Sequence, residues 1–288
     1  MSVCADVRGF FDPATHTVTY LVSDPATRQA VIIDPVLDYD AAAARTSTAS
    51  IDAVMSALRE AELTLAMVLE THAHADHLTA ADHLRRSENV PIGIGERITA
   101  VQSTFAPLFD AHDVTADGVV FDRLHADGDT FALGKLTVQV IQTPGHTPAC
   151  VSYRIGDAVF TGDTMFMPDY GTARADFPGG DARTLYRSIQ KLLALPDETR
   201  MFVGHDYLPE GRNDYRFETT VGEQRAGNVH IGGGVSEDDF VAMREARDAT
   251  LKAPQLILPS LQINIRAGAL PPPEADGRRF LKIPLNAI

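Results

Sequence analysis

The chain has 288 residues, enough to bury a substantial hydrophobic core. Its hydrophobic content of 44% and charged content of 22% are those of an ordinary soluble globular protein. The formal net charge of −14 argues against nucleic acid or an anionic membrane surface as a partner. An anionic substrate would therefore need local positive charge, from a metal ion or from arginine side chains.

Targeting segments and disulfides are not indicated. The start, Met1 to Arg8, lacks the basic-then-apolar pattern of a signal peptide, and no apolar run approaches the ~18 residues of a membrane-spanning helix. The two cysteines, Cys4 and Cys150, cannot build a disulfide framework and neither belongs to a CxxC motif. We expect a cytoplasmic protein in which Cys150 is a buried structural thiol.

The first part of the chain predicts strands that alternate with helices. Two strand-like runs, 18–22 and 30–35, are joined by a polar stretch with the composition of a hairpin loop. Apolar residues at helical spacing, and short apolar runs between them, then predict a helix over 51–63, a buried strand over 65–69, a helix over 77–87, a strand over 91–95 and a helix near 96–109.

From 119 to 161 the pattern is typical of strands. The run 136–141 alternates, and 151–155 turns through Gly156 and Asp157 into 158–161, which is a hairpin signal. A helix near 181–194 precedes a further strand over 200–204. Hairpins combined with crossover helices predict an α/β sandwich of two sheets with helices outside.

Beyond residue 215 the pattern is helical. Ser236 followed by three acidic residues predicts a capped helix start, and the closing segment 280–285 is expected to pack back on the body. We expect a single domain over 1–288, with a core of about 15–210 and a helical C-terminal extension of about 211–288.

A dense group of metal-ligand side chains lies between a predicted strand and a predicted helix. His72, His74, Asp76 and His77 fall within six positions, directly after the apolar run 65–69. Imidazole and carboxylate together suit zinc, iron or manganese, and a strand-to-helix turn can aim them into one cleft. Surface histidines in a polar loop are the alternative interpretation, which this density disfavours.

Three further candidates share the same local context. His146, Asp163 and His205 each follow a predicted strand and sit in a glycine-containing turn. Together with the first four they make seven ligands, the number needed for two adjacent metal sites that share a carboxylate. The remaining five of the ten histidines, at 16, 83, 112, 125 and 230, lack this context.

The order of these motifs resembles the metallo-β-lactamase superfamily. The motifs are Thr71-His72-Ala73-His74-Ala75-Asp76-His77, Thr143-Pro144-Gly145-His146, Thr161-Gly162-Asp163 and Gly204-His205-Asp206. The resemblance covers about residues 15–210 and implies a four-layer αββα sandwich with the metal site at one edge of the sheets. It does not define the reaction, because the superfamily includes hydrolases, nucleases and oxidoreductases.

Finer features resemble the persulfide dioxygenases, relatives of glyoxalase II, and in particular their bacterial branch. These features are Arg174-Ala175-Asp176-Phe177, His205-Asp206-Tyr207 and the stretch from Glu223 to Asn228. The resemblance implies an iron enzyme of sulfide detoxification that oxidises glutathione persulfide with O2 to sulfite and glutathione. It assigns one Fe(II) per chain to His72, His146 and Asp163. His74, Asp76, His77 and His205 would then form a vacant second site or support the ligands through hydrogen bonds.

The same resemblance suggests substrate-binding residues and a homodimer. Thr147 and Tyr207 would contact the thiol substrate, and Arg174 would either offset developing negative charge or form a structural salt bridge. Relatives carry an arginine where this chain has His230, so Arg225 or Arg266 is the substitute expected to bind a glutathione carboxylate.

Two other functions fit part of the pattern. A binuclear zinc thioester hydrolase of the glyoxalase II type would use all seven ligands around two zinc ions and a bridging hydroxide. A metal-binding sensor without catalysis would also need the ligands, although open coordination positions disfavour it.

Overall fold

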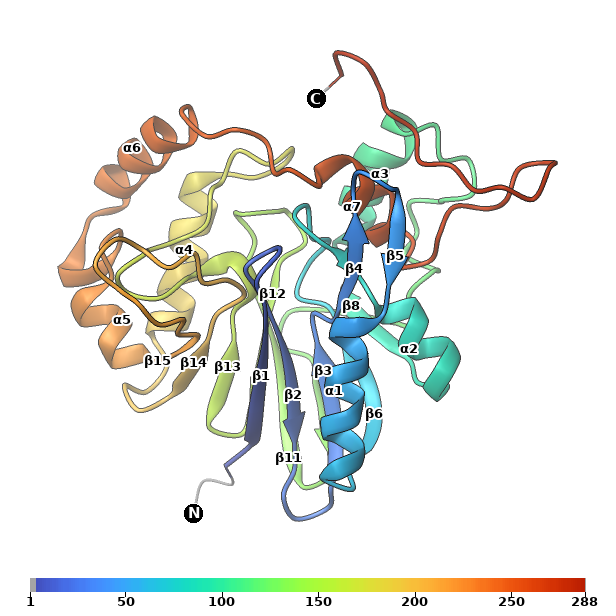
Figure 1. Cartoon of the computed structure of the whole chain (residues 1–288). Coiled ribbons are helices and arrows are strands. Elements are labelled where there is room, and N and C mark those ends of the chain that lie inside the picture. The colour runs from blue at the N-terminus through green and yellow to red at the C-terminus, as the bar shows by residue number, and fades with distance from the viewer. Residues whose placement is uncertain (1–3, 288) are drawn as a thin grey trace.

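The computed structural model describes residues 4–287 and contains two six-stranded sheets (Figure 1). The first sheet has the spatial order β1 (Asp6–Asp12), β2 (Thr17–Ser23), β3 (Gln29–Ile33), β6 (Thr64–Leu69), β8 (Ile92–Gly95) and β9 (Arg123–His125). The second has the order β10 (Thr130–Leu133), β11 (Leu136–Gln142), β12 (Val151–Ile155), β13 (Ala158–Phe160), β14 (Arg200–Phe202) and β15 (Glu218–Thr220).

The helices cover the outer faces of the two sheets. Helices α1 (Ala49–Glu60), α2 (Ala81–Glu88), α3 (Ile98–Leu108) and α7 (Ile257–Asn264) pack on the first sheet. Helices α4 (Ala182–Leu193), α5 (Val221–Gly227) and α6 (Glu237–Asp248) pack on the second. Short 3-10 turns, η1 (Gly162–Thr164) and η2 (Gly232–Gly234), complete the helical elements. The predicted αββα four-layer arrangement is confirmed.

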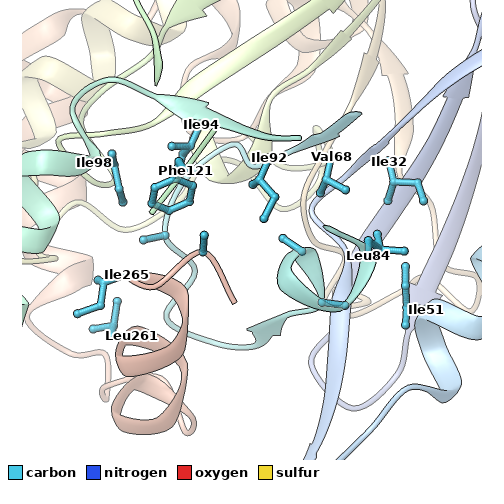
Figure 2. Close-up of a cluster of buried hydrophobic side chains, with 14 of the residues drawn as sticks. Ile32, Ile51, Val68, Leu84, Ile92, Ile94, Ile98, Phe121, Leu261 and Ile265 are labelled. Carbon is cyan, nitrogen blue, oxygen red and sulfur yellow. The ribbon is translucent and has the colours of Figure 1, made fainter. Parts of the chain in front are cut away.

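Strand β3 shows how this layering follows from sequence. Val31 and Ile33 belong to the apolar layer between the sheets, whereas Ile32 points to the helices. A strand covered on both faces needs no polar alternation, which explains the continuous run Ala30 to Ile33. Figure 2 shows the outer layer, where Ile32, Val68 and Ile92 of the sheet meet side chains of α1, α2, α3 and α7.

A small third sheet lies beside the ligand cluster and was not predicted. It has the order β5 (Arg45–Ser47), β4 (Val36–Asp40) and β7 (Leu78–Thr79). The predicted helix over 77–87 is therefore wrong at its start, because Leu78 and Thr79 pair with β4 before α2 begins at Ala81. β1 was also missed, since its sequence mixes polar and apolar residues on a partly exposed edge strand.

The C-terminal region agrees with the predicted pattern in part. The Ser236 hydroxyl accepts a hydrogen bond from the Asp239 amide and caps α6, as predicted. The expectation of helix beyond 215 missed β15. The closing segment touches the body at Lys282, whose amide donates to Gln262 Oε1, but Ile283 and Leu285 remain exposed. Among residues 4–287 no helix is both long and apolar enough to cross a membrane.

Candidate metal centre and its cavity

The predicted ligands meet because four strands end at the same edge of the sandwich. The turns that follow β6, β11, β13 and β14 carry, respectively, the 72–77 group, His146, Asp163 and His205. Glycine permits two of these turns. Gly145 has φ +135°, and a Cβ there would lie 2.3 Å from the Cα of Leu185; Gly162 has φ +48°, and its Cβ would lie 2.4 Å from Thr71 Oγ1.

The first ligand group consists of His72, His146 and Asp163. Their ligand atoms all lie within 4.8 Å of one another, and Nε2 of His72 and of His146 are 3.7 and 3.6 Å from Asp163 Oδ2. All three side chains are buried, and among residues 4–287 neither His72 Nε2 nor Asp163 Oδ1 has a hydrogen-bond partner. Buried imidazole and carboxylate atoms left unpaired in this way fit a divalent transition metal.

Hydrogen bonds on the far side of each ring set its orientation. His146 Nδ1 donates to the Arg174 carbonyl at 2.8 Å, which turns Nε2 toward the site. The Thr71 hydroxyl donates to Asp34 Oδ2 at 2.7 Å and can therefore accept from His72 Nδ1, 3.0 Å away. Burial lowers the pKa of His72 well below its usual value, so this ring is neutral and able to bind a metal.

A second group, Asp76, Asp163 and His205, shares Asp163 with the first, and a third group, His74, Asp76 and His77, shares Asp76 with the second. His205 Nε2 is 3.2 Å from Asp163 Oδ1 and 3.4 Å from Asp76 Oδ2. The Thr17 hydroxyl lies 3.2 Å from Asp76 Oδ2, 3.2 Å from His77 Nδ1 and 3.4 Å from His205 Nδ1. These residues therefore form a connected network as well as a candidate second metal site.

In this network, neighbouring charges shift the pKa values of His205 and Asp163 in the direction opposite to burial. Burial would lower the pKa of His205, but the carboxylates of Asp163 and Asp76 raise it to about 9. Burial would likewise raise the pKa of Asp163, but the imidazoles of His205, His72 and His146 hold it below its usual value. Asp163 and His205 therefore favour each other's charged forms.

The Nε2 side of His74 faces two carboxylates outside these groups, whereas its buried Nδ1 has no hydrogen-bond partner among residues 4–287. Its Nε2 lies 3.1 Å from Asp34 Oδ1 and 3.1 Å from Glu70 Oε2, and Glu70 also accepts from the Thr79 hydroxyl. Burial raises the pKa of Glu70 to about 7. Asp34 therefore supports two predicted ligands, His74 directly and His72 through Thr71. Sequence reasoning named neither Asp34 nor Glu70.

The C-terminal helix α7 also reaches the ligand loop. Asn264 Nδ2 donates to the carbonyls of His74 and His77, both at 2.8 Å, and its Oδ1 accepts from the Thr79 amide at 2.9 Å. No local signal in the sequence identifies this residue. The distant C-terminal segment thus fixes the backbone of the loop.

A cavity of about 820 Å³ opens over the centre, within the range of pockets that bind small molecules. Its walls come from the β1–β2 turn, the β4–β5 hairpin, the ligand loops and the segment from Arg244 to Leu256. One wall is aromatic: Tyr207 stacks on His205 with ring centroids 5.3 Å apart, and Tyr170 and Phe166 lie 5.1 and 5.8 Å from Tyr207. His16, not selected from sequence, also lines this cavity.

The structure brings some predicted substrate-binding residues to the cavity and not others. Tyr207 and Arg174 line it, although the Arg174 guanidinium is paired with Asp176 at 2.5 and 2.6 Å. Thr147, Arg225 and His230 do not line it. Their side-chain partners lie elsewhere: the Thr147 hydroxyl is 3.1 Å from Cys150 Sγ, Arg225 binds Asp197 and the Leu193 carbonyl, His230 Nδ1 accepts from the Thr172 amide, and the alternative Arg266 binds Asp113.

Residues 12–205 match the sequence model of the Metallo-beta-lactamase superfamily, and the match includes every candidate metal ligand. The chain belongs to this superfamily. It is 53% identical to a probable metallo-hydrolase of Burkholderia pseudomallei, with 98% of this chain and 99% of the relative covered. It is 48% identical to glyoxylase B2 of Dictyostelium discoideum, covering 100% and 99%.

Persulfide dioxygenases are similar at lower identity. The mitochondrial persulfide dioxygenase ETHE1 of Homo sapiens is 32% identical, with 92% of this chain and 90% of the relative covered. The crystal structure of ETHE1 from Myxococcus xanthus superposes with a TM-score of 0.73 at 34% identity, covering 92% of this chain and 100% of that one. The fold and the superfamily are thereby established, and the relatives at high identity carry names of different activities.

Proposed function

We propose that this chain is an iron-dependent persulfide dioxygenase that oxidises glutathione persulfide with O2 to sulfite and glutathione. The observation that carries the proposal is the group formed by His72, His146 and Asp163. Two histidines and one carboxylate on one face are the ligand set of non-haem Fe(II) oxygenases, which need open positions for both substrate and O2. The similarity to ETHE1 in sequence and structure supports the same activity.

The surroundings of the centre suit this reaction. A bound iron ion would supply the redox chemistry and favour the anionic form of the persulfide sulfur. The Arg174 carbonyl and the Thr71 hydroxyl, itself bonded to Asp34, hold His146 and His72 with their Nε2 atoms toward the site. The aromatic wall of Phe166, Tyr170 and Tyr207 excludes water from the bound sulfur.

The overall conversion balances with O2 and water as the only co-reactants. The terminal sulfur of the persulfide loses the four electrons that one O2 molecule gains. The S–S bond breaks, the carrier leaves as the thiol, and water completes the oxygen atoms of sulfite. The water molecule and the persulfide carry more protons than the carrier thiol and sulfite retain, so the conversion needs no other proton source.

A zinc thioester hydrolase is the second candidate function. The group of Asp76, Asp163 and His205, whose ligand atoms lie within 4.8 Å of one another, favours it because a second ion would share Asp163 with the first. The 48% identity to glyoxylase B2 gives this alternative weight.

The test is O2 uptake by iron-loaded protein supplied with freshly prepared glutathione persulfide, with sulfite assayed at the end. We expect sulfite and consumed O2 in equal amounts, and no hydrolysis of a glutathione thioester by the same sample. The proposal is wrong if well-loaded protein consumes no O2, whereas zinc-loaded protein hydrolyses the thioester under anaerobic conditions.

A further inference from the structure

The cavity is much larger than a persulfide group requires. Its volume of about 820 Å³ leaves room for the whole carrier molecule, so the outer walls must contact parts of the substrate remote from the sulfur. A chain with a net charge of −14 repels anionic carriers unless cations stand along their path. The charged groups of the outer wall therefore indicate which carrier the cavity accepts.

Four arginines line this cavity, and two of them already have carboxylate partners. Arg174 pairs with Asp176, and the buried Arg244 pairs with Asp248 at 2.8 Å. Among residues 4–287, Arg45 and Arg247 form no ion pair within 4.0 Å. Both are exposed and line the cavity, so neither needs to leave a carboxylate partner among these residues in order to bind a ligand.

Arg247 lies at the outer end of the aromatic wall. Arg247 and Tyr170 line the same cavity, and a side-chain hydrogen bond from Arg247 opposes the rise that burial causes in the pKa of Tyr170. Two ring-to-ring steps, of 5.1 and 5.3 Å, then lead from Tyr170 through Tyr207 to His205 at the metal centre. An extended peptide of three residues spans about 10 Å, a comparable length.

Arg45 stands on a different wall. It begins β5, opposite Asp40 of β4, at the tip of the hairpin. The Asp40 carboxylate accepts instead from the amides of Ala42 and Ala43, at 3.0 and 3.1 Å. Figure 1 shows the β4–β5 hairpin and α6, which carries Arg247, on opposite sides of the upper part of the molecule. The two cations thus come from separate segments of the mouth.

We propose that Arg247 and Arg45 bind the two carboxylate ends of a peptide-type thiol carrier, with Arg247 as the main contact, and so select glutathione-like carriers over neutral thiols. This inference rests on the proposed function for the chemistry of the sulfur, but it concerns binding alone. In this proposal Arg247 and Arg45 recognise the carboxylates. The residues expected from sequence for this role, Arg225, His230 and Arg266, lie outside the cavity.

Binding of S-methylglutathione to the iron-loaded protein, measured by calorimetry, tests the inference without turnover. We expect R247Q to bind it about tenfold more weakly and R45Q to show a smaller loss; tenfold is the low end for hydrogen bonds to charged groups and is appropriate to an exposed side chain. The diethyl ester of S-methylglutathione should bind equally to wild type and R247Q. In turnover, R247Q should raise KM with little change in kcat.

R59Q is the matched control, because Arg59 is also exposed and unpaired in the last turn of a helix but lies outside the cavity. It should bind as wild type does, and melting curves and iron content confirm the integrity of each variant. The inference is overturned if R247Q binds S-methylglutathione like wild type, or if wild type does not bind it. Binding that depends on Arg247 without any O2 uptake would refute the proposed dioxygenase and leave the carboxylate contact intact.

Discussion

Asn264 gives the sharpest test of how the ligand loop is held. The side chain is buried and makes three hydrogen bonds to the backbone of His74, His77 and Thr79. Its orientation is determined by chemistry, because the two carbonyls can only accept and the Thr79 amide can only donate. Asn264→Ala removes all three bonds and leaves their buried partners unsatisfied.

The expected cost is about 3 kcal/mol or more, since three buried groups lose their partners and each unsatisfied buried group costs about 1–3 kcal/mol. Urea denaturation measures this as a lower midpoint at unchanged slope. Because the loop also carries His72, we expect the apparent affinity for the metal to fall about tenfold or more in a chelator competition assay.

Asn228 supplies the matched control for this experiment. Its side chain is similarly buried and also makes three bonds, to the Gly171 carbonyl, to Gln224 Oε1 and from the His230 amide, at 3.0, 2.7 and 2.9 Å. N228A should lose comparable stability yet keep its metal affinity. If N264A and N228A change metal affinity equally, or if N264A is as stable as wild type, α7 does not hold the loop as described.

Three other predictions follow from single contacts. Asp163→Ala should abolish retention of iron and activity, because Asp163 joins the first two ligand groups; full iron content with normal turnover would contradict the assignment. Arg212→Gln should cost about 3 kcal/mol in urea denaturation, because the buried Asp206 loses its two paired bonds at 2.5 Å, and D206N should recover part of this in the double variant. Burial lowers the pKa of His230 from 6.5 to about 4, so only the unfolded chain takes up this proton as the pH falls through that range. Stability should therefore decrease from pH 6.5 toward 4, and His230→Gln should flatten the profile; an unchanged slope would exclude this contribution.

The layering of the fold could be predicted from sequence because it depends on local apolar patterns. Strands such as Leu65 to Leu69 are marked by unbroken apolar runs and end where ligand side chains begin. Since these strand ends gather at one edge of the sandwich, the order of the motifs also predicted that His72, His146, Asp163 and His205 would meet. The short strands β4 and β7 were missed because two or three pairing residues leave no periodic signal.

The supporting residues could not be predicted, for a different physical reason. Thr17 and Asn264 act on the ligand loop from 59 to 190 positions away in sequence, through contacts that leave no local pattern. Arg225 is the converse case, a residue that was predicted to bind substrate but does not reach the cavity. It adjoins a recognisable motif, but α5 directs its guanidinium to Asp197 and the Leu193 carbonyl, away from the cavity. A motif specifies which residues are near in sequence, and the packing of its helix decides which of them face the site.

The C-terminal extension has a direct part in the site. Asn264 of α7 holds the loop that bears the first ligands, and Asp248 of α6 accepts from the Ala175 amide at 2.8 Å, one residue after the carbonyl that orients His146. Arg247 of the same helix reaches the mouth of the cavity. The extension therefore supports the metal ligands through Asn264 and Asp248, and it contributes Arg247 to the wall of the cavity. Changes within it are expected to alter metal affinity and carrier selectivity separately, since different residues on two helices mediate the two effects.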